Sequence, residues 1–294
     1  MSLWQLLFSP FTDPDLLFMR RALAGCFALA LGSSPLGVLL IQRRMSLVGD
    51  AMSHAILPGA AIGYFFYGLS LPAMTIGGIA AGLIVAILAG LVSRFTTLKE
   101  DASFATFYLI SLALGVLIIS MRGTSKDLLH VLFGSVFAMD NATLLLAALI
   151  ASCSVIALAL MYRPLIIQSL DPYFLSMQGR WNGITYAVFL LLLVFNLVGG
   201  FHTLGTLMAV AFMVLPACAA RFWARTVFTQ MLVSVLFAIV AGYVGLLIAY
   251  HCNAIPISAS PAIVLTLGFI YFISIFWGSH SGLLRQHKKM QHMH

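Results

Sequence analysis

No Asp, Glu, Lys or Arg occurs in residues 226–284, which read TVFTQMLVSVLFAIVAGYVGLLIAYHCNAIPISASPAIVLTLGFIYFISIFWGSHSGLL. Residues 181–220 also lack these four residue types. A membrane-spanning helix needs about 20 predominantly apolar residues, and each stretch is long enough to supply them. Over the whole chain 62% of the residues are hydrophobic and 8% are charged, whereas a soluble domain is about 25% charged. Lipid must therefore be the solvent for much of the surface, and the sequence predicts a polytopic membrane protein.

The remaining charges and the Gly and Pro breaks divide the chain into apolar segments. They predict about nine helices, at 17–41, 46–67, 72–93, 103–121, 142–161, 183–200, 204–220, 226–250 and 260–278. The segment 204–220 is short for a full crossing. Small residues four apart, such as Gly59 and Gly63, allow helices to approach closely in lipid. We therefore expect an all-α fold, a transmembrane helical bundle of about 8–9 spanning helices that forms a single domain over residues 1–294.

Basic residues are unevenly divided between the two sides that nine spans define. One side collects most of them, namely Arg43, Arg44, Arg94, Lys99, Arg163, Arg180, Arg221, Arg225, Arg285, Lys288 and Lys289. The other side collects Arg20, Arg21, Arg122 and Lys126. Because cytoplasmic loops carry the excess of Lys and Arg, we expect the C-terminus inside and the N-terminus outside. The same rule accounts for the formal charge of +7, so no nucleic-acid partner is expected.

Sequence signatures of catalysis and of fixed cofactor sites are missing. The sequence contains no Walker A motif, no G-x-S-x-G and no H-E-x-x-H. The four cysteines are scattered without a C-x-x-C pair. We therefore expect a protein that is not itself an enzyme and holds no permanently bound cofactor, with membrane lipid as its surroundings.

Asp50 is the one acid that falls inside a predicted span, and His54 follows it by four residues. On a helix this spacing places two side chains on one face, about 6 Å apart. A carboxylate and an imidazole on one face are a minimal pair of ligands for a divalent transition metal. An ionisable residue inside a membrane is costly and is usually functional. The alternative is that Asp50 and His54 satisfy one another and pin two helices together.

Two prolines lie in the segments that carry candidate ligands. Pro58 offers no N–H to the carbonyl of His54, and Pro216 offers none to the carbonyl of Phe212. Broken helices with freed carbonyls are a recurrent way to build an ion site in a membrane. The alternative is that each proline only kinks its helix.

The seventh predicted span carries weaker metal candidates. His202 lies near its outer end, where an imidazole can pass an ion inward, and Met213 and Cys218 are soft ligands further along. The alternatives are an interfacial histidine and ordinary packing, which is the usual role of Met and Cys in apolar helices.

Residues 163–180 form a segment on the expected cytoplasmic side. Asp171 and Pro172 are typical of a helix N-cap and first helical residue, and Gly179 is typical of a helix end. The sequence thus predicts a short helix at about 170–179, with apolar side chains available for a partner, namely Tyr173, Phe174 and Met177. The alternative is a helix that rests on lipid headgroups.

The last residues, about 283–294, end in HKKMQHMH. Terminal tails are usually poorly ordered, and three histidines without a carboxylate or thiol are not a closed ligand set. We expect a disordered cytoplasmic tail; the alternative is a metal-receiving or regulatory element.

Residues 45–59, MSLVGDAMSHAILPG, resemble the signature of permease subunits of the bacterial manganese/zinc/iron (metal-chelate) ABC importers. Residues 201–220 and 260–264 are similar to two further segments of that family, and the likeness covers nearly the whole chain. Ser53 and the Leu-Pro-Gly after His54 are more similar to the manganese and iron members than to the zinc members.

This resemblance implies an ABC importer permease that moves a divalent transition metal into the cytoplasm, with manganese favoured over zinc and iron. It implies a second copy of the permease, cytoplasmic ATP-binding subunits that hydrolyse ATP, and an extracytoplasmic metal-binding protein. It further implies the bacterial cytoplasmic (inner) membrane, and a coupling helix near Asp171 that docks onto the ATPase. The rival interpretation is a gradient-driven secondary metal-ion transporter or channel. That class needs intramembrane charges for coupling, and the sequence offers only Asp50.

Overall fold

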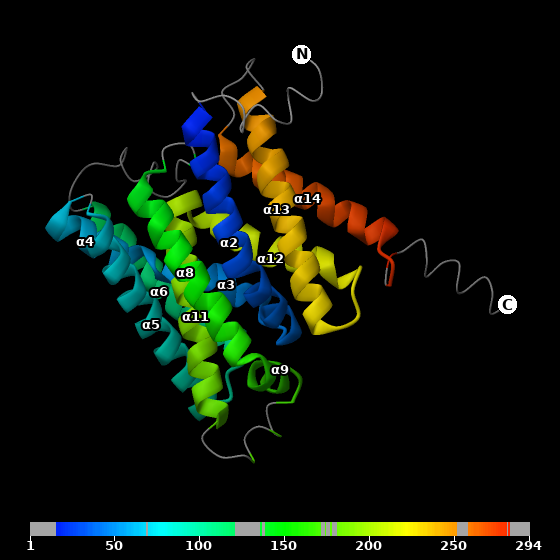
Figure 1. Cartoon of the computed structure of the whole chain (residues 1–294). Coiled ribbons are helices and arrows are strands. Elements are labelled where there is room, and N and C mark those ends of the chain that lie inside the picture. Colours follow the sequence, from blue (N-terminus) through cyan, green and yellow to red (C-terminus); the bar gives the residue numbers. More distant parts are fainter. Residues whose placement is uncertain are drawn as a thin grey trace.

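The computed structural model describes residues 16–68, 70–120, 136, 139–171, 174, 177, 181–251, 258–280 and 282. The regular elements in these residues are helices (Figure 1). Their bounds are α2 Leu17–Gln42, α3 Ser46–Ala55, α4 Leu57–Tyr67, α5 Leu71–Phe95, α6 Glu100–Ser120, α8 Asn141–Leu160, α9 Tyr162–Leu170, α11 Trp181–Leu204, α12 Thr206–Arg221, α13 Val227–His251 and α14 Ala259–Trp277.

The all-helical bundle agrees with the sequence-based expectation. Seven of the described helices are long and apolar enough to cross a membrane, namely α2, α5, α6, α8, α11, α13 and α14. Two other predicted spans differ in detail: 204–220 is the shorter helix α12, and 46–67 is divided into α3 and α4. The expected number of about 8–9 spans is therefore approximate.

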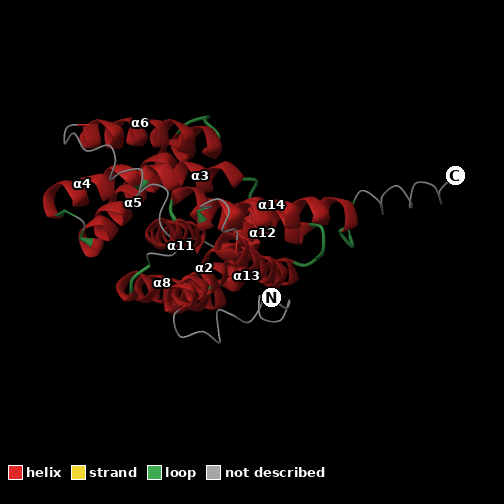
Figure 2. Ribbon diagram, turned by 90° about the horizontal axis from the view of Figure 1, so that it is seen from above, coloured by secondary structure: helices red, strands yellow, loops and turns green. Residues whose placement is uncertain are grey.

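The bundle is arranged around α2, α11 and α12. Helix α2 contacts α8, α11, α12 and α13, and α11 also packs against α5 and α12. Seen from above, α2, α8 and α13 lie on one side of the bundle, while α6 lies at the opposite edge with α3 just inside it (Figure 2). The short helix α9 lies at the lower end of the bundle in Figure 1, far from the start of α2. The two ends of the bundle are thus distinct, and α3 lies away from the edge that α2 and α8 form.

Glycines bring α4 and α5 into backbone contact. A Cβ atom on Gly59 would collide with the carbonyl of Gly77, and a Cβ on Gly77 with the carbonyl of Gly59. One turn further on, a Cβ on Gly63 would lie 2.6 Å from the carbonyl oxygen of Ala73. The small residues four apart in the sequence therefore form a helix–helix contact, as their spacing predicts.

The connection from α2 to α3 is a tight, ordered turn. Arg44 has a φ of 60°, in the left-handed region that favours glycine. The N–H of Met45 donates to the carbonyl of Leu40 at 3.0 Å, and the N–H of Arg44 donates to that of Ile41 at 3.1 Å. This is the hydrogen-bond pattern of a Schellman helix end, and the buried side chains of Met45 and Leu40 match its usual apolar contact. The start of α3 is therefore firmly attached to the end of α2.

The break between α3 and α4 lies at Ile56, two residues before Pro58. Pro58 is thus in the first turn of α4, where a residue without an N–H costs nothing, and not in a helix interior as expected. The carbonyl of Ala55, at the end of α3, accepts the hydroxyl of Ser111 on α6 at 3.1 Å. Pro216 differs, because α12 runs through it without a break as far as Arg221. The helix therefore does not break at Pro216, while the carbonyl of Phe212, which Pro216 leaves without a helical N–H, accepts the hydroxyl of Ser34 at 3.2 Å.

Helix α9 is an element that the sequence analysis did not predict. After a turn at Met161, Tyr162–Leu170 form a helix that contacts α2, α8 and α11. The segment for which a short helix is predicted comes next, and the structure describes Asp171, Phe174 and Met177 of it. Asp171 accepts the N–H of Phe174 at its Oδ1, 3.1 Å away, which is the capping contact expected of it. Pro172, Tyr173 and Gly179, like the tail at 283–294, lie outside the described residues.

Candidate metal site

Asp50 and His54 lie on one face of α3, one helical turn apart, as their spacing requires. Their facing atoms, Oδ1 of Asp50 and Nε2 of His54, are 3.8 Å apart. This separation is too long for a hydrogen bond. Each atom can bond to one shared ion at about 2.1 Å, because two such bonds span up to about 4.2 Å. The carboxylate of Asp50 and the imidazole of His54 could therefore bind one ion between them.

The pair is exposed on the surface of the chain. The side chain of Asp50 is 60% exposed and that of His54 is 32% exposed. Leu47, one turn earlier on the same face, is 68% exposed, whereas Val48 and Met52 on the opposite face are buried. A carboxylate and a large apolar side chain thus share one uncovered face of the short helix α3. A bare carboxylate facing lipid is costly, so this face needs a polar environment or a partner.

Neighbouring helices hold the pair in place. The ring of Tyr108 on α6 stacks against that of His54, with centroids 6.0 Å apart and an interplanar angle of 30°. Behind the pair, the terminal carbon of Met213 on α12 lies 2.8 Å from where a Cβ on Gly49 would be. Gly49 therefore leaves room for the end of the Met213 side chain, which a larger residue at this position would displace. Nδ1 of His54 is buried without a hydrogen-bond partner, which leaves that nitrogen to be satisfied by something other than the described side chains.

The weaker metal candidates are not gathered around Asp50 and His54. Among the described residues no group of three or more His, Cys, Asp and Glu side chains is placed to hold a metal ion. His202, at the end of α11, has its Nε2 3.1 Å from Oγ1 of Thr75. That hydroxyl already donates to the carbonyl of Leu71, so Nε2 of His202 carries the proton of this contact. Met213 is fully buried against α3, and Cys218 lies a turn further along α12.

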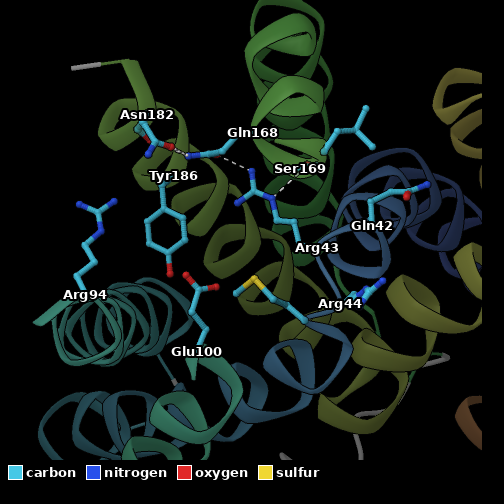
Figure 3. Close-up of a pocket in the computed structure, with 11 residues that line it drawn as sticks. Gln42, Arg43, Arg44, Arg94, Glu100, Gln168, Ser169, Asn182 and Tyr186 are labelled. Atoms are coloured by element: carbon cyan, nitrogen blue, oxygen red, sulfur yellow. Dashed lines mark hydrogen bonds between the residues drawn. The ribbon is translucent and has the colours of Figure 1, made fainter. Parts of the chain in front are cut away.

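A second polar site, which the sequence analysis did not identify, lies at the end of the bundle that carries α9 (Figure 3). It is a cavity of about 480 Å³ at the ends of α2, α5, α6, α9 and α11. Its lining includes Arg43, Arg94, Glu100, Gln168 and Tyr186. In the sequence, Arg43 and Arg94 serve only as evidence for the orientation of the chain. The signal available was that these basic residues and Glu100 all flank span ends on one side.

Arg43 is the centre of this second site. Its Nη2 donates to Oε1 of Gln168 at 2.6 Å, and its Nε donates to Oγ of Ser169 at 3.2 Å. Its guanidinium lies 4.0 Å from the centroid of the buried Phe189 ring. Gln168 in turn donates to Oδ1 of Asn182 at 2.6 Å. One arginine therefore joins the α2–α3 turn to both α9 and α11.

The predicted partner-binding side chains directly follow α9. Phe174 is 51% exposed and Met177 is 87% exposed. Both are at the α9 end of the bundle, because α9 ends at Leu170 and Asp171 caps the turn that contains Phe174. Two exposed apolar side chains thus follow α9, the helix that also carries two of the hydrogen-bond partners of Arg43.

Comparison with known proteins places the chain among transport proteins. The model of the ABC 3 transport family matches residues 15–278. The manganese import system permease protein ScaB of Streptococcus parasanguinis is 32% identical over 259 residues, which cover 88% of this chain and 90% of that protein. The manganese transport system membrane protein MntC of Listeria innocua is 30% identical over 272 residues, 92% of this chain and 95% of that protein. A solved structure of PsaBC from Streptococcus pneumoniae in complex with Fab matches with a TM-score of 0.82 and 27% identity, over 97% of this chain and 99% of the other.

Proposed function

Because this chain belongs to the ABC 3 transport family, we propose that it is the membrane-spanning permease of an importer that moves a divalent transition metal, manganese above zinc and iron, into the cytoplasm. The observation that carries the proposal is the Asp50–His54 pair, open to an ion and exposed on α3. The names of the relatives ScaB and MntC, both manganese permeases, support the choice of metal.

The chemistry of the pair suits this cargo. Carboxylate oxygen is a ligand that manganese accepts readily, and imidazole suits iron and zinc as well. A transported ion must also leave, so a site with few ligands from one chain is more useful than a closed cage. The metal is thus substrate, and no resident metal is part of the proposal.

Two ligands from one chain leave the coordination of the ion incomplete. A two-fold axis beside the exposed face of α3 would bring the same pair from a second copy, and so supply two carboxylates and two imidazoles. It would also cover Leu47 and remove the carboxylate of Asp50 from lipid. We therefore propose a homodimer of permeases whose shared interface contains the metal path.

The remaining partners follow from the two ends of the bundle. Asp171, Phe174 and Met177 at the α9 end form the proposed contact with cytoplasmic ATP-binding subunits, which supply the energy. That end also has Arg43, Arg44 and Arg94, in keeping with a cytoplasmic side in the inner membrane. The opposite end, where α11 ends near His202, would receive the ion from an extracytoplasmic metal-binding protein.

Uptake of radioactive manganese, zinc and iron by the reconstituted permease–ATPase complex tests the proposal. We expect ATP-dependent accumulation, fastest for manganese, that continues when proton and sodium gradients are collapsed. Uptake that follows an imposed gradient and ignores ATP would instead establish the rival secondary transporter or channel.

A further inference from the structure

The turn between α2 and α3 links the second polar site to the metal pair. Arg43 precedes the first residue of α3, Ser46, by three positions. The turn between them is held by the hydrogen bonds of Arg44 and Met45 and by the buried side chain of Met45. A short, ordered turn transmits displacement of Arg43 to α3, and Asp50 lies in the second turn of that helix.

On its other side, Arg43 is held by the segment that leads into the proposed ATPase contact. Both of its side-chain hydrogen bonds to α9 are to Gln168 and Ser169, within three residues of Asp171. Gln168 is buried, and its amide also donates to the backbone carbonyl of Asn182 at 2.7 Å. The forked guanidinium thus has fixed hydrogen-bond partners on α9. Helix α9 directly precedes the Asp171–Met177 segment, so a movement of that segment would displace α9 first.

Arg43 stays in its charged form although it is largely buried. Burial lowers the pKa of its guanidinium to about 10, and the nearby Glu100 acts against that shift. The group therefore remains protonated at neutral pH. Arg94 is held in the same cluster, 5.2 Å from the centroid of the Tyr186 ring. Figure 3 shows the hydroxyl of Tyr186 directed at Glu100, between the two arginines.

We propose that Arg43 is a positioning residue for transport: it couples α9, and with it the ATPase contact, to the metal-bearing helix α3. This inference rests on the proposed function, because it assigns the energy input to the α9 end and the metal to α3. Arg43 does not touch the metal. It sets the position of α3 according to the position of α9, so that ATP-driven movement of the docking segment changes the accessibility of Asp50 and His54.

The test measures metal transported per ATP hydrolysed by the reconstituted complex. The variants are Arg43→Gln, Gln168→Met and the double variant. The matched control is Gln42→Met, because Gln42 is the neighbouring residue and its Nε2 donates to Oε1 of Gln230 on α13, 2.9 Å away, not to α9. Basal ATPase rate, manganese binding to the complex and unfolding temperature are measured on every variant.

We expect Arg43→Gln and Gln168→Met each to lower the metal transported per ATP about tenfold, with ATPase rate and manganese binding retained. The double variant should lose no more than either single variant, because both remove one link. Gln42→Met should transport as much metal per ATP as the unaltered complex, even if its unfolding temperature falls as far as those of the Arg43 and Gln168 variants. If Arg43→Gln does not fold, Gln168→Met and the control still decide the question.

Three outcomes would overturn the inference. If Arg43→Gln or Gln168→Met transports as much metal per ATP as the unaltered complex, Arg43 does not couple α9 to α3. If Gln42→Met lowers the metal transported per ATP as much, the effect is one of general stability. If the loss in the double variant is the product of the two single losses, Arg43 and Gln168 act independently. Asp50→Asn is assayed in parallel. If it keeps manganese binding and uptake, the proposed metal site is wrong. The metal transported per ATP by the Arg43 variants is a separate measurement, so the two failures can be told apart.

Discussion

At the scale of single residues, the helical period explains why Asp50 and His54 are found together. A spacing of four places them on one face whatever the rest of the fold does. Their environment, by contrast, depends on residues distant in sequence. Tyr108 on α6 stacks on the imidazole, and Gly49 lets Met213 on α12 pack behind it. Local sequence thus brings Asp50 and His54 together, and tertiary contacts from α6 and α12 hold them in place.

Asp50→Asn and His54→Ala should each abolish most metal uptake while the complex still assembles. Even outer-shell partners of a metal cost 10- to 100-fold when they are removed, so loss of a ligand should lower uptake by at least about tenfold. Radiometal uptake and co-purification with the ATPase measure the two expectations. Near-normal uptake by both variants would leave Asp50 and His54 as a structural pair only.

At the scale of elements, α4 and α5 pack as closely as they do because neither helix has a Cβ at the contact. Gly77→Ala should destabilise the protein by about 1–3 kcal/mol, since the added methyl group collides with the backbone of Gly59. Gly183 on α11 is the matched control, because a Cβ there meets nothing within 4 Å. Gly183→Ala should stabilise the helix by up to about 1 kcal/mol. Thermal unfolding in detergent compares the two, and equal effects would contradict the close contact.

The segment after α9 carries the prediction for coupling to the ATPase. Phe174→Asp should lower both ATPase co-purification and uptake, by about fivefold or more, because a charge in an apolar interface must be desolvated without a partner. Leu98→Asp is the control, since Leu98 is also half exposed and lies in the loop between α5 and α6. If Phe174→Asp retains binding and uptake, the segment rests on lipid and another surface docks the ATPase.

At the scale of the whole molecule, the positive charges and the polar network coincide at one end of the bundle. Arg43, Arg44 and Arg94 line the cavity beside α9, and Arg225 donates to Nδ1 of His280 near the end of α14. The charge asymmetry that predicts orientation therefore also supplies the side chains of a tertiary network. A basic residue near a span end can serve both purposes.

Truncation after Gly282 removes the basic and histidine-rich tail from this end. Arginines such as Arg221 and Arg225 would still favour the expected orientation under the positive-inside rule, so we expect uptake to stay within about twofold of the full-length complex, as is usual for terminal tails. Uptake, expression and orientation in membrane vesicles are measured together. A large fall in uptake with normal expression and orientation would make the tail a metal-receiving or regulatory element.

The sequence by itself determined the class of fold, the approximate spans and the Asp50–His54 pair. Apolar runs between charges report where lipid must be the solvent, and a four-residue spacing reports a shared helix face, so both can be read from local sequence. Only the tertiary structure decided where helices end, that α3 and α4 are separate and that α12 runs through Pro216. It alone also joined Arg43 to Gln168 and Tyr108 to His54. The physical reason is that hydrogen bonds and ring contacts between helices depend on the packing of residues far apart in the chain, which no local pattern encodes.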